Sequence, residues 1–225
     1  MSKEAKSDTV LAYCLLKQDL FFSKIPADEV PRYVQTALDA GAEAAAEHAH
    51  QSVKDWYEQY QIKIVYKDRG AAFGGTEFRA QIDYTGKEPH IVLYRQALDR
   101  LSQVCPDVET AILGHELFHY LEVTRKRHVS DQLPPVITFR LGPLQRKAAI
   151  QTASEIAAHK FSKDLGGLPY LGNYYDYLYL VQTGKLQSQT LKASLKVLAQ
   201  EYQSLCGEGT HPPAESEVRN GPRER

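Results

Sequence analysis

The spacing of apolar residues predicts helices in the first part of the chain. Over residues 28–60, apolar and alanine residues recur every three or four positions, which predicts one long helix packed through a narrow face. Residues 10–22 form a shorter apolar stretch that stops before Pro26, and they predict a helix docked on the body of the protein. Two helices are therefore expected before any strand.

Apolar and polar residues then alternate, which is typical of strands. Residues 62–66, 78–84 and 90–94 alternate or are rich in β-branched and aromatic side chains, and turns at residues 70–75 and 86–89 separate them. These segments predict three strands in one mostly antiparallel sheet.

The helical period returns after the strands. Residues 106–126, 145–165 and 188–205 predict three further helices, of which the first begins at Pro106 and the second ends at Gly166. A proline-rich loop is expected between the first two, and an aromatic segment over residues 170–179 precedes the last. The predicted fold class is α+β, a small three-stranded sheet with additional helices at both ends.

Length and composition indicate one main domain. A chain of 225 residues with 43% hydrophobic residues buries roughly 70% of its unfolded surface, which suffices for one core. We expect an N-terminal helical extension over residues 1–27 and a main domain over residues 28–206, helical from about residue 170 onward. Residues 207–225 are rich in Gly, Pro, Glu and Arg and are expected to be a disordered tail.

Charge and cysteine usage exclude several classes of protein. A net charge of −1 creates no positive electrostatic field that would attract nucleic acid or anionic lipid, so no direct nucleic acid binding is expected. Cys14, Cys105 and Cys206 lie far apart, which excludes a disulfide scaffold and a thiolate metal site. Without a membrane-length apolar run or a signal peptide, the sequence predicts a cytoplasmic protein with no membrane partner.

The segment 115–119 carries the motif His-Glu-x-x-His. Because positions i and i+4 of a helix lie on one face, His115 and His119 can place two imidazole nitrogens on one zinc ion. Glu116 is turned away from the metal and can take the proton of a metal-bound water. The motif predicts a catalytic zinc site in which Glu116 is the base.

A third ligand is expected from a later helix, since no Gly-x-x-His continuation follows His119. The segment 154–161, Ser-Glu-Ile-Ala-Ala-His-Lys-Phe, contains small residues that allow two helices to approach closely. Its Glu155 is the favoured ligand and completes a His₂Glu site with an open position for water. His159, one turn further along, is the alternative ligand or a hydrogen-bond partner of a ligand.

These motifs, over residues 64–169, resemble the ImmA/IrrE-type zinc metallopeptidases of the gluzincin-like group. The glycine-containing turn at Gly74 and Gly75 and two strands precede the His-Glu-x-x-His helix, in the family's order. Residues 155–161 are similar to the family's Glu-x-x-Ala-Asn/Asp-x-Phe-Ala signature, and Leu168 and Pro169 match the Leu-Pro that follows it.

The resemblance implies a zincin-like domain and a zinc-dependent endopeptidase. It implies one zinc ion per chain on His115, His119 and Glu155, with Glu116 as catalytic base. The implied substrate is a protein or peptide, such as an intracellular transcriptional repressor. The chain departs from the family in having His159 where Asn or Asp is usual, and in an insertion over residues 124–147 that can form a lid or a recognition loop.

Peptide hydrolysis also requires groups that hold the substrate. We expect an extended peptide to pair with the edge of the strand at residues 90–94, just before the zinc helix. That strand contributes His90, Val92 and Tyr94. The candidate donors to the oxyanion are Tyr170, Tyr174, Tyr175, His128 and Arg140.

Two functions of other classes stay open at the level of sequence. The first is a catalytically inactive protein-interaction module, against which the intact Glu116 argues, because a structural metal site needs no base. The second is a phage-linked or toxin–antitoxin component that a partner activates. If no metal binds, His115 and His119 are two surface histidines of an amphipathic helix.

Overall fold

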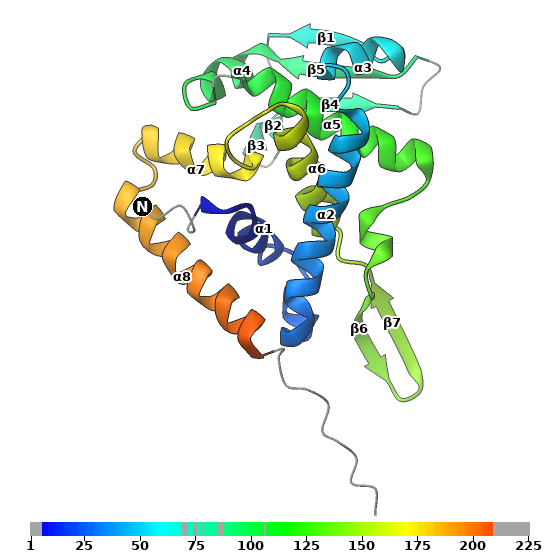
Figure 1. Ribbon diagram of the computed structural model, residues 1–225, viewed down its shortest axis with the longest axis vertical. Helices are drawn as coiled ribbons and strands as arrows, with labels where there is room; N and C mark the ends of the chain where they lie inside the picture. The colour runs from blue at the N-terminus through cyan, green and yellow to red at the C-terminus, as the bar shows by residue number, and fades with distance from the viewer. Residues whose placement is uncertain are drawn as a thin grey trace, which may run out of the picture.

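The computed structural model describes residues 6–68, 72–73, 76–77, 79–84, 88–105 and 107–208. A three-stranded sheet lies at one end of the molecule, helices fill the middle, and a separate hairpin projects at the other end (Figure 1). The helices are α1 (Asp8–Leu16), α2 (Val30–His48), α3 (Val53–Gln59), α4 (Arg95–Ser102), α5 (Val108–Arg125), α6 (Thr152–Leu165), α7 (Gly172–Gln182) and α8 (Ser188–Glu208), with 3₁₀ turns η2 (Phe22–Lys24), η3 (Ala27–Glu29) and η4 (Val129–Gln132). The strands are β1 (Lys63–Lys67), β2 (Ala72–Phe73), β3 (Thr76–Glu77), β4 (Ala80–Asp83), β5 (His90–Tyr94), β6 (Val136–Leu141) and β7 (Leu144–Ala148).

Strand β5 is the centre of the sheet, whose order is β1–β5–β4. β1 runs parallel to β5, with Ile64 opposite Ile91, and β4 runs antiparallel, with Ile82 opposite Ile91. The α+β class with a small sheet is confirmed, but the mostly antiparallel arrangement is wrong. A short connection joins β4 to β5 and makes them antiparallel, whereas β1 pairs with the opposite edge of β5 after a longer connection and is parallel to it.

The long helix expected over residues 28–60 is two helices, α2 and α3. The Asp55 amide donates to the Ser52 hydroxyl (3.2 Å), and the Ser52 amide donates to the Asp55 carboxylate (3.1 Å). This reciprocal capping starts a new helix at Val53. The apolar spacing continues across the break, which is why periodicity alone joined the two helices.

Residues 136–148 form the hairpin β6–β7, where the sequence predicted a loop and the start of a helix. Val136 and Ile137 are β-branched, and Gly142 at the turn has φ +56°, a conformation that favours glycine. The helix expected over residues 145–165 begins at Thr152, where the Asp19 carboxylate accepts hydrogen bonds from the Thr152 amide and hydroxyl (3.3 and 2.8 Å). Helix α4 was not predicted from the sequence, whereas α7 lies in the part of the chain after residue 170 that was expected to be helical.

Helix α6 packs against both α2 and α5. Its small residues Ala153, Ala157 and Ala158 have no exposed surface. On α5, a β-carbon at Gly114 would come within 3.0 Å of the Ser162 Cα, so only glycine fits there without a shift. Small residues on both sides therefore bring α5 and α6 close together, as the sequence predicted.

The N-terminal helix α1 belongs to the main core, since Leu11 and Leu16 are fully buried within it. None of the helices in the described ranges is both long and apolar enough to cross a membrane. Gly74, Gly75, Pro106 and residues 209–225 of the expected tail lie outside the described part of the chain.

Candidate metal centre

Three donor atoms converge between α5 and α6. The His115 and His119 Nε2 atoms lie 3.2 Å apart. The His115 Nε2 atom lies 3.3 Å from one oxygen of the Glu155 carboxylate, and the His119 Nε2 atom lies 3.4 Å from the other. In a tetrahedral site with about 2.0–2.1 Å between metal and ligand, neighbouring ligands are about 3.3–3.4 Å apart. These distances are close to that spacing, so the three side chains can hold one metal ion between them, and among the described residues no fourth His, Cys, Asp or Glu joins the cluster.

Local structure explains why these atoms meet. His115 and His119 stand one turn apart on α5, so their rings face the same side. Glu155 lies in the first turn of α6, which the Gly114–Ser162 contact holds against the same stretch of α5. The three sequence-predicted ligands are thus brought together by one helix period and one close helix packing.

A buried carboxylate that the sequence reasoning missed orients His119. Glu122 is 5% exposed and its carboxylate lies 3.1 Å from the His119 Nδ1 atom. It also accepts hydrogen bonds from the Val129 amide and the Ser154 hydroxyl, both at 2.8 Å. A proton held on Nδ1 leaves the Nε2 lone pair free for a metal. The sequence did contain a signal for this contact, because Glu122 follows His119 by three positions and residues three apart on a helix are neighbours.

The carboxylates around His119 determine its protonation. Burial alone would lower the pKa of His119, but hydrogen bonds to Glu122 and Glu155 outweigh it and raise the pKa to about 10. Hydrogen bonds from His115 and His119 hold the pKa of Glu155 far below its usual range. Two anions thus surround a protonated imidazole in the metal-free protein, and a divalent cation can replace that positive charge.

His159 contributes no atom to the three-atom cluster. Its ring lies 4.6 Å from the ring of His115, centroid to centroid. Burial, followed by the neighbouring His115, holds the pKa of His159 well below its usual range, so its ring is neutral. Gly172 at the start of α7 packs directly on this ring, because a β-carbon there would collide with the His159 Nδ1 atom. The geometry places His159 as a packing neighbour of a ligand.

A cavity of about 390 Å³ opens beside the cluster. Glu116 borders it, one residue from the first ligand, and Arg79 and Asp176 form an ion pair at its wall. The rest of the wall is largely apolar. It is formed by Ala80, Leu101, Cys105, Val108, Ala111, Ile112, Gly172 and Tyr175, together with His115, Glu155 and His159.

One of the five candidate oxyanion donors, Tyr175, lines this cavity. Its hydroxyl is buried and has no hydrogen-bond partner among the described residues. Burial, together with the nearby Cys105 thiol, raises the pKa of Tyr175 to about 12. The group therefore stays protonated near neutral pH and keeps its O–H donor.

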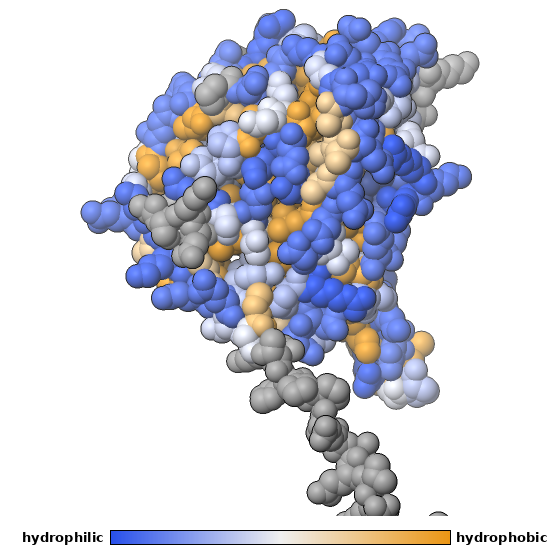
Figure 2. Space-filling view, viewed as in Figure 1, coloured by the Kyte–Doolittle hydropathy of each residue, from blue (hydrophilic) through white to orange (hydrophobic). Residues whose placement is uncertain are grey.

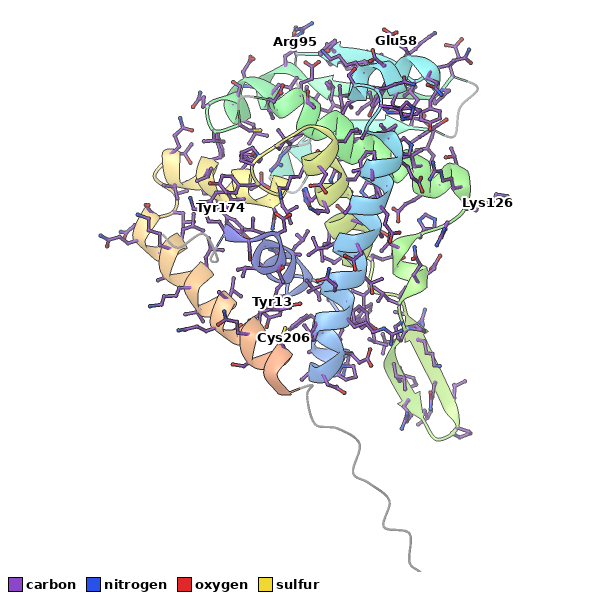
Figure 3. All side chains as sticks on the ribbon, in the orientation of Figure 1. Tyr13, Glu58, Arg95, Lys126, Tyr174 and Cys206 are labelled. Carbon is purple, nitrogen blue, oxygen red and sulfur yellow. The ribbon has the colours of Figure 1, made fainter. Side chains whose placement is uncertain are left out.

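The other four candidate donors lie elsewhere. Tyr174, labelled beside α7 in Figure 3, packs on Tyr170, and the Lys6 ammonium lies over both rings at 5.5 and 5.3 Å. His128 lies 4.0 Å from Glu122, outside the cavity wall, and Arg140 is exposed on β6. Sequence order could not separate these residues, because their distance from the motif in space depends on how α7 and the hairpin pack.

The expected substrate edge at residues 90–94 is wrong. β5 is paired on both sides, with β1 and with β4, so it has no free edge for a peptide. Val92 and Tyr94 point to the far face of the sheet, where they pack on Ala97, and His90 pairs with Lys63 and Asp83. The strand nearest the cavity is β4, which begins at the cavity-lining Ala80.

Comparisons with known protein families, with curated proteins and with solved structures found no match to this chain.

We expect Glu122→Ala to lower both stability and metal affinity. The substitution leaves the Val129 amide, the Ser154 hydroxyl and the His119 imidazole without their partner, which costs about 2–4 kcal/mol of unfolding free energy. Zinc affinity should fall about 10- to 100-fold, because the His119 ring loses its orientation. Denaturant unfolding and zinc titration measure the two effects.

Glu122→Gln provides the matched variant. Its side-chain oxygen can still accept from Val129 and Ser154, so much of the stability should return. Its amide presents N–H groups toward the His119 Nδ1 atom, which then accepts a hydrogen bond and leaves the ring proton on Nε2. Because Nε2 is the atom that would bind the metal, zinc affinity should stay low. Wild-type zinc affinity in Glu122→Ala would contradict the orienting role.

Proposed function

We propose that this protein is a zinc-dependent peptidase with a zincin-like domain. The observation that carries the proposal is the convergence of the His115 and His119 Nε2 atoms, 3.2 Å apart, on the Glu155 carboxylate, whose two oxygens lie 3.3 and 3.4 Å from them, close to the spacing of ligands on tetrahedral zinc. The Glu116 carboxyl borders the adjacent cavity and is not one of the three ligands. A structural site is normally closed by four protein ligands, whereas this one has three and an open side.

In the proposed mechanism, His115, His119 and Glu155 would hold the zinc ion, which would supply Lewis acidity and make a nearby water more acidic. The Glu116 carboxylate accepts a proton from the attacking water as the water oxygen bonds to the peptide carbonyl carbon. Glu116 then delivers that proton to the amine nitrogen as the carbon–nitrogen bond breaks. The proton taken from the water is the one given to the amine, so these steps need no other proton source.

Two further features of the cavity support hydrolysis. Tyr175 lines the cavity and its hydroxyl stays protonated, so it is the proposed donor to the carbonyl oxygen as negative charge develops there. The wall is largely apolar around Leu101, Val108 and Ile112, which suits the apolar side chains of a peptide. The proposed substrate is a protein or peptide, as the family resemblance implies.

The proposal is tested by metal content and metal dependence. We expect one zinc ion per chain, by elemental mass spectrometry, in protein purified without a metal-affinity column. Incubation with a peptide mixture should yield new termini that 1,10-phenanthroline abolishes and added zinc restores. Absence of zinc even after zinc is added back would refute the proposal. Bound zinc without cleavage would favour the non-catalytic interaction module.

Zinc binding is expected to release a proton from His119. Because the pKa of His119 is raised to about 10, its imidazole is protonated at neutral pH before the metal binds. Zinc binds neutral imidazole, so the apparent affinity should rise about tenfold for each pH unit from about pH 6 to 8. Calorimetry in buffers of different ionisation enthalpy measures the released proton. A pH-independent affinity would contradict this assignment.

A further inference from the structure

The β6–β7 hairpin carries an exposed apolar surface outside the metal centre. Phe139, Leu141 and Leu144 are 53%, 67% and 65% exposed, and all three lie near its turn. In Figure 2 hydrophobic and hydrophilic residues lie side by side where the hairpin projects at the lower right. Large apolar side chains gathered at such a projection are typical of an interaction site.

The register places these side chains on one face. Leu141 pairs with Leu144, and Phe139 pairs with Arg146. Because alternate residues of a strand share a face, these four residues form one face of the hairpin. Below it, the buried Val136 anchors the base of the hairpin in the core. The tip is therefore exposed while its base is held in place.

The hairpin is also uniformly basic. Arg140, Arg146 and Lys147 are its charged residues, and none of them forms an ion pair within the described part of the chain. A partner that covers this surface must be anionic to match it.

Both outer edges of the hairpin are open. Among the described residues β6 and β7 pair only with each other. An added peptide strand would satisfy the free N–H and C=O groups along one edge. In a lipid bilayer those groups would lose water without gaining partners. A second copy of the hairpin would bring Arg140, Arg146 and Lys147 against like charges. The observations thus favour a peptide.

We propose that this surface, defined by Phe139, Leu141, Leu144 and Arg146 with the adjacent strand edge, docks an extended acidic segment of a partner protein. The backbone of that segment pairs with the hairpin edge, its apolar side chains cover the apolar face, and its carboxylates meet the unpaired cations.

The hairpin precedes, along the chain, the helix that carries one of the three clustered side chains. β7 ends at Ala148, and α6, which carries Glu155, begins at Thr152. If the proposed peptidase function holds, the bound partner is the substrate, and the insertion acts in recognition. Docking itself requires no zinc and no cleavage, so it can be tested separately.

Fluorescence anisotropy with three labelled 14-residue peptides tests the proposal. The peptides share alternating apolar residues, and their remaining positions are all Glu, all Ser or all Lys. The full chain should bind the Glu peptide at least about tenfold more tightly than the Ser peptide, and added salt should weaken this binding. Zinc-free protein should bind equally well, which separates docking from the proposed catalysis.

Two sets of hairpin variants and a control decide the outcome. Phe139→Ser with Leu141→Ser and Leu144→Ser should weaken binding at least about tenfold, because the apolar contacts are lost. Arg140→Glu with Arg146→Glu and Lys147→Glu should reverse the preference to the Lys peptide. Leu20→Ser, at a residue 86% exposed elsewhere, should change nothing.

The proposal is overturned by unchanged binding in both hairpin variants, or by equal affinity for the three peptides. It is also overturned if the serine variant instead abolishes binding to phosphatidylserine vesicles, or dissociates a dimer seen by sedimentation. Thermal unfolding of each variant confirms that its fold is retained, since every substituted side chain is solvent-exposed.

Discussion

Glu116→Gln is expected to lower peptide hydrolysis about 100- to 10,000-fold while zinc stays bound. The amide keeps the size of the carboxyl group but cannot accept the proton of the attacking water. Glu116 is not one of the three convergent ligands, so the metal-binding atoms are unchanged. The measurements are the rate of peptide cleavage at fixed zinc occupancy and the zinc content per chain.

The matched control is Glu58→Gln, at an exposed glutamate on α3 that Figure 3 labels at the sheet end of the molecule. It makes the same chemical change outside the cavity and should leave both zinc content and turnover unchanged. Undiminished cleavage by Glu116→Gln would remove this residue from the role of base. Loss of zinc in Glu116→Gln would instead show that its carboxyl group contributes to metal binding.

Glu155→Ala is expected to lower zinc affinity by at least about 100-fold, more than the loss of a residue that only orients a ligand. The substitution removes one of three donors and the only carboxylate among them. It leaves His115 and His119 as a two-nitrogen site on one helix, which binds zinc weakly. Zinc titration with a competing chromophoric chelator measures the affinity.

His159→Ala separates the two ligand hypotheses made from the sequence. Its ring contacts His115 but lies outside the donor cluster, so this variant should retain zinc. Glu58→Ala is the matched control for removal of a glutamate. Zinc lost in His159→Ala and retained in Glu155→Ala would make His159 the third ligand and contradict the assignment from geometry.

The sequence pattern was sufficient to predict the candidate site residues wherever their contacts lie within one helix. The i, i+4 spacing of His115 and His119 places both rings on one face whatever surrounds them. The neighbouring Glu116 follows from the same helix geometry. Glu155 also came from local pattern, because its alanine-rich neighbours signalled a helix that could approach another closely.

Predictions failed where hydrophobic periodicity alone did not decide the structure. The apolar period runs through residues 28–60, but the Ser52–Asp55 capping box starts a new helix at Val53. The segment at residues 136–148 contains both helix and strand formers, and the Gly142 turn with cross-strand pairing makes it a hairpin.

The sequence by itself determined the α+β class, the helix that carries His115 and His119, and the choice of Glu155 as the side chain expected to join them, because these depend on periodicity and on residues close together in the chain. Tertiary structure alone decided that β5 is central and that Glu122 orients His119. It also placed Tyr175 in the cavity wall. These outcomes depend on contacts between segments distant in sequence, which no local pattern encodes.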